Sequence, residues 1–527
     1  MASSVYRSAA QVTAFSTVEK SLSFAYRIIL SRFLGAEGVG IYQICLSVFS
    51  VFLTMASSGI PVTVSRMIAR QTALGSESGK HAVVTAGVLS TLMFTLPAAV
   101  IIFFGREALA FLFPDRDSLN IFTILLPGLV LTSVYAVMRG AFWGNKQFLP
   151  YSLIELAEDS VMVVLGTVLA FTAVSPADGA MKATAAALIS YVFSFFVSVG
   201  WYLAHGGRFT SPKSQLKPLL ASAMPITAMR TSTSLLNSVV ATFLPALLIG
   251  ACGYDNSQAL AVYGAVTGMS LPVLFIPNAL IGSIAVVVAP EMSENYYAGK
   301  TDRLKRDVER TIKGAMTVAA LLAPVLFAAG EDLGVLLFDN AFSGRVIRDF
   351  AFMLMPMCVS MITTTVLNSM NCEVKTLIYF FIGALFMLAC IFILTPFMGV
   401  YSYMTGLAGS NVITAVLNVR LLRNKCKGVK CINFCLKSLG VSAVAAAFGS
   451  AARGLAQALP TVAGAAVATV SAAAFAVCGL LALGLLDADY FIGLVKGRLN
   501  TACRKERKVR NMCGKAGRNS RKRQSNS

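Results

Sequence analysis

Three charged residues lie inside the first long apolar segment of the chain, residues 9–33. Glu19, Lys20 and Arg27 fall on one arc of a helix at 100° per residue, and the opposite arc is apolar. A charge at bilayer depth costs at least about 2.5 kcal/mol, so it normally faces a partner, water or the interior of a bundle. The pattern therefore predicts one wall of a polar cavity within a membrane bundle.

A later segment, residues 219–249, carries a similar polar stripe. Its members at helical spacing are Thr227, Arg230, Ser234, Asn237 and Ser238. We expect Arg27 and Arg230 to face each other across a cationic cavity. The alternative is that both are structural, paired with Glu19 or with backbone carbonyls. Lys20 shares the face of Arg27 and cannot pair with its neighbour Glu19.

Other ionisable residues could reach the same cavity. Residues 151–173 begin with Glu155, Glu158 and Asp159. The helix dipole favours acids near an N-terminus, which is a structural explanation for Glu155 and Asp159. Glu158 lies deeper and is the better candidate for the cavity.

Two arginines, Arg66 and Arg139, end predicted helices. Snorkelling of their side chains to the membrane surface explains them adequately. Phosphate binding at the cavity mouth is the alternative.

The composition shows which elements must position these residues. The 527 residues are 56% hydrophobic and only 13% charged, and the mean hydropathy is +0.73. A multi-pass membrane protein is expected, with about 20 apolar residues per crossing. We predict fourteen crossings: 9–33, 39–68, 82–104, 119–143, 151–173, 183–204, 219–249, 260–289, 312–329, 349–370, 376–396, 401–422, 434–453 and 461–485.

The basic residues predict the orientation. Of the 44 lysines and arginines, 34 fall in segments on the side of the N-terminus, 7 on the other side, and Lys20, Arg27 and Arg230 within the membrane. Positive residues favour the cytoplasm, so both termini are expected there, in a cell-membrane protein. The same rule accounts for the net charge of +20 without a nucleic-acid partner.

An internal repeat predicts the architecture. Without gaps, Pro127 aligns with Pro356, Arg139 with Asn368, and Lys146 with Lys375. Six crossings per half make the two repeats parallel. The expected fold is an all-α integral membrane protein with an N-lobe at 1–210, a C-lobe at 211–425, two extra peripheral helices at 426–495 and a basic cytoplasmic tail at 496–527. The tail could contact anionic lipid.

Catalysis and cofactors find little support. His81 and His205 are the only histidines, and no HExxH, GxSxG or P-loop pattern is present. We expect no enzymatic activity and no cofactor. Cys426, Cys431 and Cys435 have a spacing unusual for zinc and no histidine nearby, so no metal site is predicted.

Several motifs resemble a known family. They are Arg27-Ile-Ile-Leu-Ser-Arg32-Phe-Leu-Gly35 continuing to Tyr42, Met138-Arg139-Gly140-Ala-Phe142-Trp-Gly144 continuing to Tyr151, and Pro290-Glu291-Met-Ser-Glu294. Over roughly residues 5–485 the chain resembles the stage V sporulation protein B family. That family belongs to the MOP exporter superfamily, with MurJ-type lipid II flippases, Wzx-type O-antigen flippases and MATE exporters.

The resemblance implies a V-shaped, two-lobed bundle that works by alternating access. It also implies export of a polyprenyl-pyrophosphate-linked saccharide, similar to lipid II, from the cytoplasmic to the outer leaflet. The cargo would be a peptidoglycan precursor for spore cortex. The membrane potential, sodium or protons would supply the coupling.

There are three departures from the family pattern, and two of them, at Glu155 and Met162, make the cavity less cationic. Trp143 and Glu155 stand where the family usually has Gln, and Met162 stands where it often has Arg. Two alternatives stay open. A MATE-like exporter of organic cations would depend more on Glu19 and Glu158 than on the arginines. A non-transporting membrane protein of envelope assembly would tolerate loss of the intramembrane charges.

Overall fold

The computed structural model describes residues 2–212, 215–278, 300–426, 431–456 and 460–485, with a few single residues between these ranges. Within them the chain is helical and has no strand. The predicted tail at 496–527, Lys213 and most of the 290–294 motif lie outside the described residues.

The first half of the chain forms six long helices. They are α1 (Ala2–Ser57), α2 (Ile60–Ala73), α3 (Glu77–Phe104), α4 (Arg116–Gly144), α5 (Phe148–Phe171) and α6 (Pro176–Ala204), with a short 3₁₀ helix at Arg106–Leu112. Gly35 interrupts α1 with φ 65° and ψ −178°. Because an L-residue rarely adopts this conformation, glycine permits the chain to reverse there, between the first two predicted crossings.

The second half contains two long helices, α7 and α11, and several shorter ones. Its helices are α7 (Leu216–Cys252), α8 (Asn256–Gly264), α9 (Leu271–Leu274), α11 (Thr301–Phe338), α12 (Ala341–Asp349), α13 (Leu354–Ser369), α14 (Glu373–Met398), α15 (Tyr401–Lys425), α16 (Cys431–Leu455) and α17 (Thr461–Ala482). A π-helical stretch at Ala265–Ser270 joins α8 to α9.

Eleven of the described helical stretches are long and apolar enough to cross a membrane. The first of these, Phe15–Thr72, contains most of the first predicted crossing and all of the second. Two further helices, α5, which carries three acidic residues, and the more polar α15, correspond to two further crossings of the prediction. The predicted class, an all-α multi-pass membrane protein, is confirmed.

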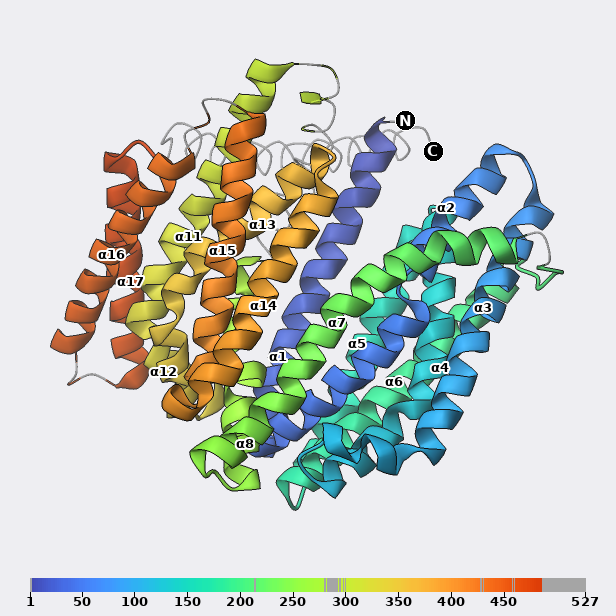
Figure 1. Cartoon of the computed structure of the whole chain (residues 1–527), viewed down its shortest axis with the longest axis horizontal. Coiled ribbons are helices and arrows are strands. Elements are labelled where there is room, and N and C mark those ends of the chain that lie inside the picture. The colour runs from blue at the N-terminus through green and yellow to red at the C-terminus, as the bar shows by residue number, and fades with distance from the viewer. Residues whose placement is uncertain are drawn as a thin grey trace, which may run out of the picture.

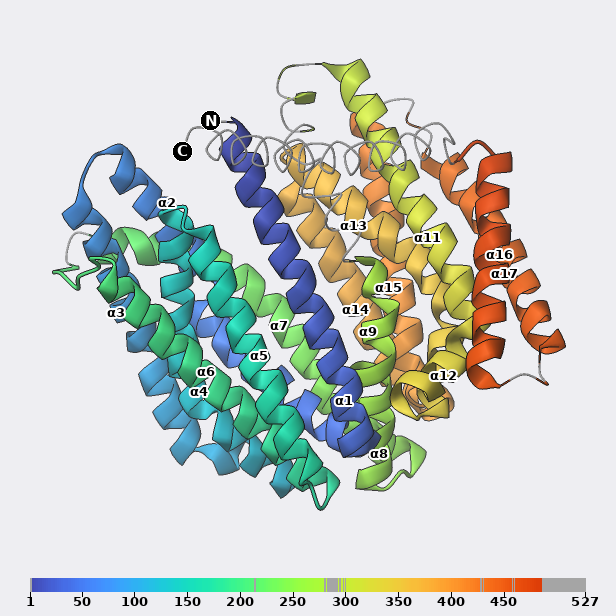
Figure 2. The same cartoon turned by 180° about the vertical axis from the view of Figure 1, so that it is seen from behind.

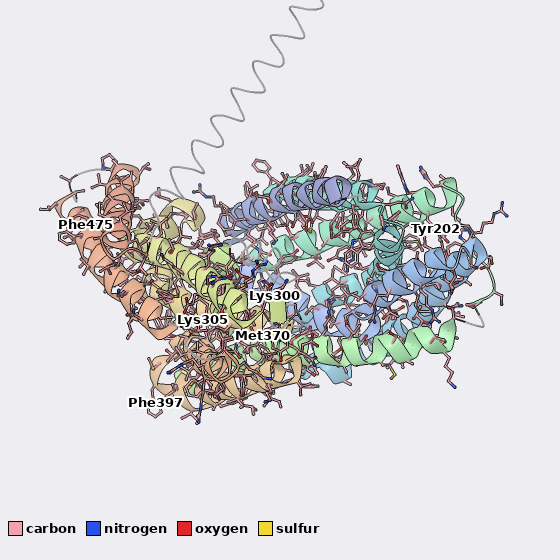
Figure 3. All side chains as sticks on the ribbon, turned by 90° about the horizontal axis from the view of Figure 1, so that it is seen from above. Tyr202, Lys300, Lys305, Met370, Phe397 and Phe475 are labelled. Carbon is pink, nitrogen blue, oxygen red and sulfur yellow. The ribbon has the colours of Figure 1, made fainter. Side chains whose placement is uncertain are left out.

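The helices form two groups on either side of α1 and α7. Helices α2 to α6 lie on one side and α11 to α17 on the other (Figure 1). We call α1 to α6 the N-lobe and α8 to α17 the C-lobe. Helices α16 and α17 pack against α11, and seen from above, Phe475 of α17 and Tyr202 of α6 mark opposite edges of the bundle (Figure 3).

The lobes meet at the end of the bundle where α8 lies, which we call the α8 end (Figure 2). Arg32 Nε donates to the Leu337 carbonyl at 3.0 Å, and its Nη2 donates to the Leu336 carbonyl. Ser257 Oγ donates to Glu37 at 2.7 Å. These contacts close the bundle at the α8 end, opposite the end where α1 begins, which we call the α1 end.

A glycine pair brings the two lobes into direct backbone contact at the α8 end. A Cβ added to Gly264 of α8 would lie 2.0 Å from the Ala36 carbonyl oxygen of α1, and one added to Gly40 would lie 2.2 Å from the Leu260 carbonyl oxygen. No side chain fits at such distances, so the helices can cross this closely only because both positions are glycine.

Helix α7 contributes to the cores of both groups. Near its start, Leu219 and Ala223 are buried in a cluster that includes Ile60 and Val64 of α2. Further along, Leu244 and Leu248 are buried in a cluster that includes Ile391 of α14. Figure 1 shows α7 running diagonally from α8 towards α2. The domain boundary expected at 210/211 stays a prediction.

Candidate functional site

A cavity of about 300 Å³ lies between α1, α4 and α5, with α7 at its edge. Its charged lining residues are Glu19, Arg139, Glu155, Glu158, Asp159 and Arg230. Arg139 comes shortly before the end of α4, and Glu155 is two turns into α5. At a rise of 1.5 Å per residue, these residues lie ~10 Å from the helix termini. The pocket is therefore in the half of the N-lobe nearest the α1 end.

The three acids of α5 reach the pocket because of where that helix begins. Helix α5 begins at Phe148 and has no acidic residue in its first turn. The helix dipole acts mainly within the first turn, so the dipole explanation for Glu155 and Asp159 is wrong. Positions 155, 158 and 159 have the i, i+3, i+4 spacing of one helix face, and that face lines the pocket.

Each of these carboxylates has a partner on another helix. Ser23 Oγ of α1 donates to Asp159 Oδ2 at 3.3 Å. Glu158 is hydrogen-bonded to the Ser194 side chain of α6. Glu155 lies 3.7 Å from the Arg139 guanidinium. The face is thus tied to α1, α6 and α4, which fixes the positions of its carboxylates.

The Arg139 side chain does not extend to the membrane surface as the snorkelling interpretation requires. Its side chain is 31% exposed and lies beside Glu155. Its guanidinium carbon lies 5.4 Å from the centre of the Trp143 ring, a distance at which a cation–π interaction is favourable. Trp143 also meets Tyr151 edge-on, with ring centres 5.6 Å apart. One departure from the family pattern, Trp143, therefore helps to hold Arg139 towards the pocket.

Arg230 reaches the pocket from α7. Its Nη1 donates to the Ser58 carbonyl oxygen at 3.2 Å. On the same stripe, Thr227 Oγ1 accepts from the Gly59 backbone N–H at 3.1 Å, and Ser234 is hydrogen-bonded to Ser50 at 3.1 Å. The predicted polar face of α7 thus packs on the junction of α1 and α2. Arg230 also keeps an exposed side chain that lines the pocket.

Four predicted site residues lie elsewhere. Arg27 and Lys20 are exposed on α1, and Asn237 is exposed on α7; none of the three lines the pocket. Arg27 is close enough to Tyr42 for an electrostatic interaction. Arg66 Nη2 donates to Ser222 Oγ at 3.1 Å and so joins α2 to α7. A role of these residues in binding stays a prediction.

The sequence interpretation missed two residues of α4. Thr132 and Tyr135 line the pocket at three-residue and four-residue steps before Arg139, the spacing of one helix face. This polar stripe in an apolar helix was a usable signal. Tyr135 is 4% exposed, and its hydroxyl has no hydrogen-bond partner among the described residues.

The charge of the pocket differs from the expected cationic cavity. Four carboxylates face two guanidinium groups, so the fully ionised lining is net negative. Such a site can bind a cation through its carboxylates and an anionic group through Arg230. Among the described residues no group of three or more His, Cys, Asp or Glu is arranged to hold a metal ion. The Cys431 side chain lies outside the described residues.

Comparison with known proteins places the chain in a family. The model of a family described as polysaccharide biosynthesis protein matches residues 5–296. The chain belongs to this family. It is 21% identical to stage V sporulation protein B of Bacillus subtilis (strain 168) over 77% of this chain and 80% of that protein. It is also 21% identical to the lipid II flippase MurJ of the same organism, over 62% of this chain and 64% of that protein.

Solved structures show the same fold. An inward-facing multidrug-resistance MATE transporter of the MOP superfamily superposes with a TM-score of 0.66 at 16% identity, covering 79% of this chain and 96% of that one. The lipid II flippase MurJ in an inward closed conformation gives 0.65 at 14% identity, covering 90% and 99%. The resemblance predicted from the sequence motifs is confirmed.

Proposed function

We propose that this protein moves a polyprenyl-pyrophosphate-linked saccharide from the cytoplasmic to the outer leaflet by alternating access. Family membership and the relatives support a transporter of the flippase type. The 34-to-7 division of basic residues supports assigning the α1 end, and both termini, to the cytoplasm. The cargo we propose is a peptidoglycan precursor similar to lipid II.

The observation that carries the proposal is a charged pocket placed nearer to one end of a bundle that is closed at the other. The pocket lies towards the α1 end. The lobes are held together at the α8 end by hydrogen bonds from Arg32 and Ser257. Such contacts can break and re-form, because each contributes only about 1 kcal/mol net. With the α1 end in the cytoplasm, this arrangement corresponds to a state loaded from that side.

The exposed basic residues would bind the pyrophosphate. Arg27 and Lys20 of α1 and Arg230 of α7 have exposed side chains, and guanidinium groups bind phosphate oxygens in a bidentate manner. Arg66 and Asn237 are further polar contacts that we assign to the headgroup. Coupling would come from the membrane potential or from sodium or protons.

Translocation of fluorescent lipid II in proteoliposomes tests the proposal. We expect the wild-type protein to expose the headgroup to an impermeant quencher, and Arg230→Ala and Arg27→Ala each to slow this about tenfold. Arg106→Ala, which alters an exposed arginine outside the pocket, is the matched control. Wild-type rates for both test variants would rule out the assigned cationic contacts, and no translocation by any form would rule out the flippase.

The acidic lining favours one second candidate, an exporter of small organic cations. Four carboxylates beside two guanidinium groups suit a cationic cargo better than an anionic one. Ethidium efflux from proteoliposomes, with an imposed sodium or proton gradient, distinguishes the two. Efflux that depends on Glu158 and is unaffected by Arg230→Ala would favour the exporter.

A further inference from the structure

The pocket is divided into an acidic part and a basic edge. Glu155, Glu158 and Asp159 project from one face of α5, and Glu19 lies opposite them on α1. Arg139 is engaged with Glu155 and the Trp143 ring. Arg230 enters separately from α7. One acid is therefore partly neutralised by an arginine, and the other three retain only hydroxyl partners or face the cavity.

An independent feature indicates that the acidic part takes a ligand. The Tyr135 side chain lines this pocket, and its hydroxyl, buried within electrostatic range of Glu158 and Glu155, has no hydrogen-bond partner among the described residues. Leaving a buried polar group unpaired costs about 1–3 kcal/mol. Such a group is satisfied when a ligand that can hydrogen-bond enters the cavity.

The size of the pocket limits what that ligand can be. A volume of about 300 Å³ is at the lower end of small-molecule sites, which span roughly 300–1,000 Å³. It can hold one sugar ring or one aliphatic amine, but not a complete headgroup with its pyrophosphate. The pocket is a subsite for one group of a larger cargo.

We propose that this subsite binds a primary ammonium group carried by the headgroup of the lipid-linked cargo. Glu158 and Asp159 accept hydrogen bonds from the ammonium, and the Tyr135 hydroxyl supplies a further oxygen. Arg230, at the edge, contacts an anionic group of the same headgroup. The inference rests on the proposed function and narrows it, because cargo with a free amine is preferred to the same cargo without one.

Acetylation of the amine provides the direct test. The probes are lipid II whose stem peptide has a free side-chain amine and the same lipid with that amine N-acetylated. Binding to the full chain in lipid nanodiscs is measured for each. We expect acetylation to weaken binding to the wild-type protein at least tenfold, since a hydrogen bond to a charged group is lost. Equal affinities for the two lipids would overturn the inference.

Two variants connect the effect to the pocket. Glu158→Gln keeps the shape of the side chain and removes its charge, so we expect the preference for the free amine to fall about tenfold. Tyr135→Phe removes an oxygen that has no protein partner, so we expect unchanged thermal stability and weaker binding of the free-amine lipid. Glu77→Gln, in a side chain that is 75% exposed on α3, is the matched control. Full preference in both pocket variants would assign the effect to another site.

The outcomes distinguish failure of the inference from failure of the proposed function. If both lipids are translocated and bound equally, the flippase stands and the ammonium subsite is wrong. If neither lipid binds and free pentylamine binds in a Glu158-dependent manner, the pocket binds a small free amine and not an amine of a lipid-linked cargo. That result overturns the lipid-linked source and the proposed function together.

Discussion

The two lobes of the repeat differ in where they place their charges. In the N-lobe, four carboxylates and Arg139 line an internal pocket. In the described part of the C-lobe, the ion pairs join helices near the α8 end, as between Arg453 and Asp332 at 2.6 Å and between Arg348 and Glu331 at 2.5 Å. Both lobes use charge, and among the described residues the N-lobe arrangement places charged groups around a cavity.

One matched position shows the difference directly. Arg139 in the N-lobe aligns with Asn368 in the C-lobe. Arg139 faces the pocket beside Glu155. Asn368 accepts a hydrogen bond from the Thr376 hydroxyl at 2.7 Å, across the turn between α13 and α14. The same position therefore serves a binding pocket in one half and a local turn in the other. We interpret the N-lobe as the half that recognises cargo and the C-lobe as the half that moves against it.

The largest effect is expected where the two lobes touch. Gly264→Ala places a Cβ about 2.0 Å from a backbone oxygen of α1, and overpacking of this kind costs about 1–3 kcal/mol. Because the contact exists only when the α8 end is closed, the variant should favour opening there. Labelling of a cysteine placed at Val39, which is buried and faces Gly268 across the junction, with an impermeant thiol reagent and in a background without other cysteines, measures this.

A matched control keeps that result interpretable. Gly250→Ala changes a glycine of α7, where a Cβ would meet nothing within 4 Å, and should leave labelling unchanged. Equal labelling of the Gly264→Ala and unmodified proteins would show that the junction between the lobes is not formed as described.

A smaller effect is expected at the N-lobe member of the matched pair. Arg139→Ala removes the partner of Glu155 and the cation over Trp143. The rate of translocation should change by about tenfold, because the charge of the pocket changes. This corresponds to about 1.4 kcal/mol in the activation free energy. Thermal stability should fall little, since half-exposed ion pairs contribute at most about 1 kcal/mol. A large loss of stability with normal translocation per folded molecule would make Arg139 structural.

The smallest effect on translocation is expected at Asn368, the C-lobe residue of the matched pair. Asn368→Ala removes one hydrogen bond at the α13–α14 turn, which should lower the free energy of unfolding by about 0.5–1 kcal/mol. Translocation should not change, because Asn368 does not line the charged pocket. If Asn368→Ala and Arg139→Ala impair translocation equally, the functional difference between the lobes is wrong.

The sequence predicts the helices well because two signals depend on each helix alone. These are the length of its apolar segment and the distribution of basic residues at its ends. The reversal at Gly35 falls between two predicted crossings, and the stripe of α7 lies on one face as expected. The pairing of Arg139 with Glu155 could not be predicted, because it depends on the packing of α4 against α5. The separation of Arg27 from the pocket depends likewise on how the helices are packed around the cavity.

The start of α5 was misjudged for a local reason. Proline is tolerated in the first turn of a helix because the N–H groups there have no intrahelical acceptor. Pro150 was therefore compatible with a helix that starts before it, at Phe148. That earlier start places the acids three residues further from the N-terminus than predicted, which weakens the structural interpretation and favours a binding one.

The position of α7 has a kinetic consequence. One end of this single helix is anchored to α2 through Arg66 and Ser222, and the other end packs on α14. Any rotation of one lobe against the other must strain this helix until it bends or until one of its two anchoring contacts breaks. Pro245 lies near the second anchor and has no N–H to close a helical hydrogen bond, so the helix can bend there. The time that α7 takes to bend then becomes a lower limit on the duration of each transport cycle.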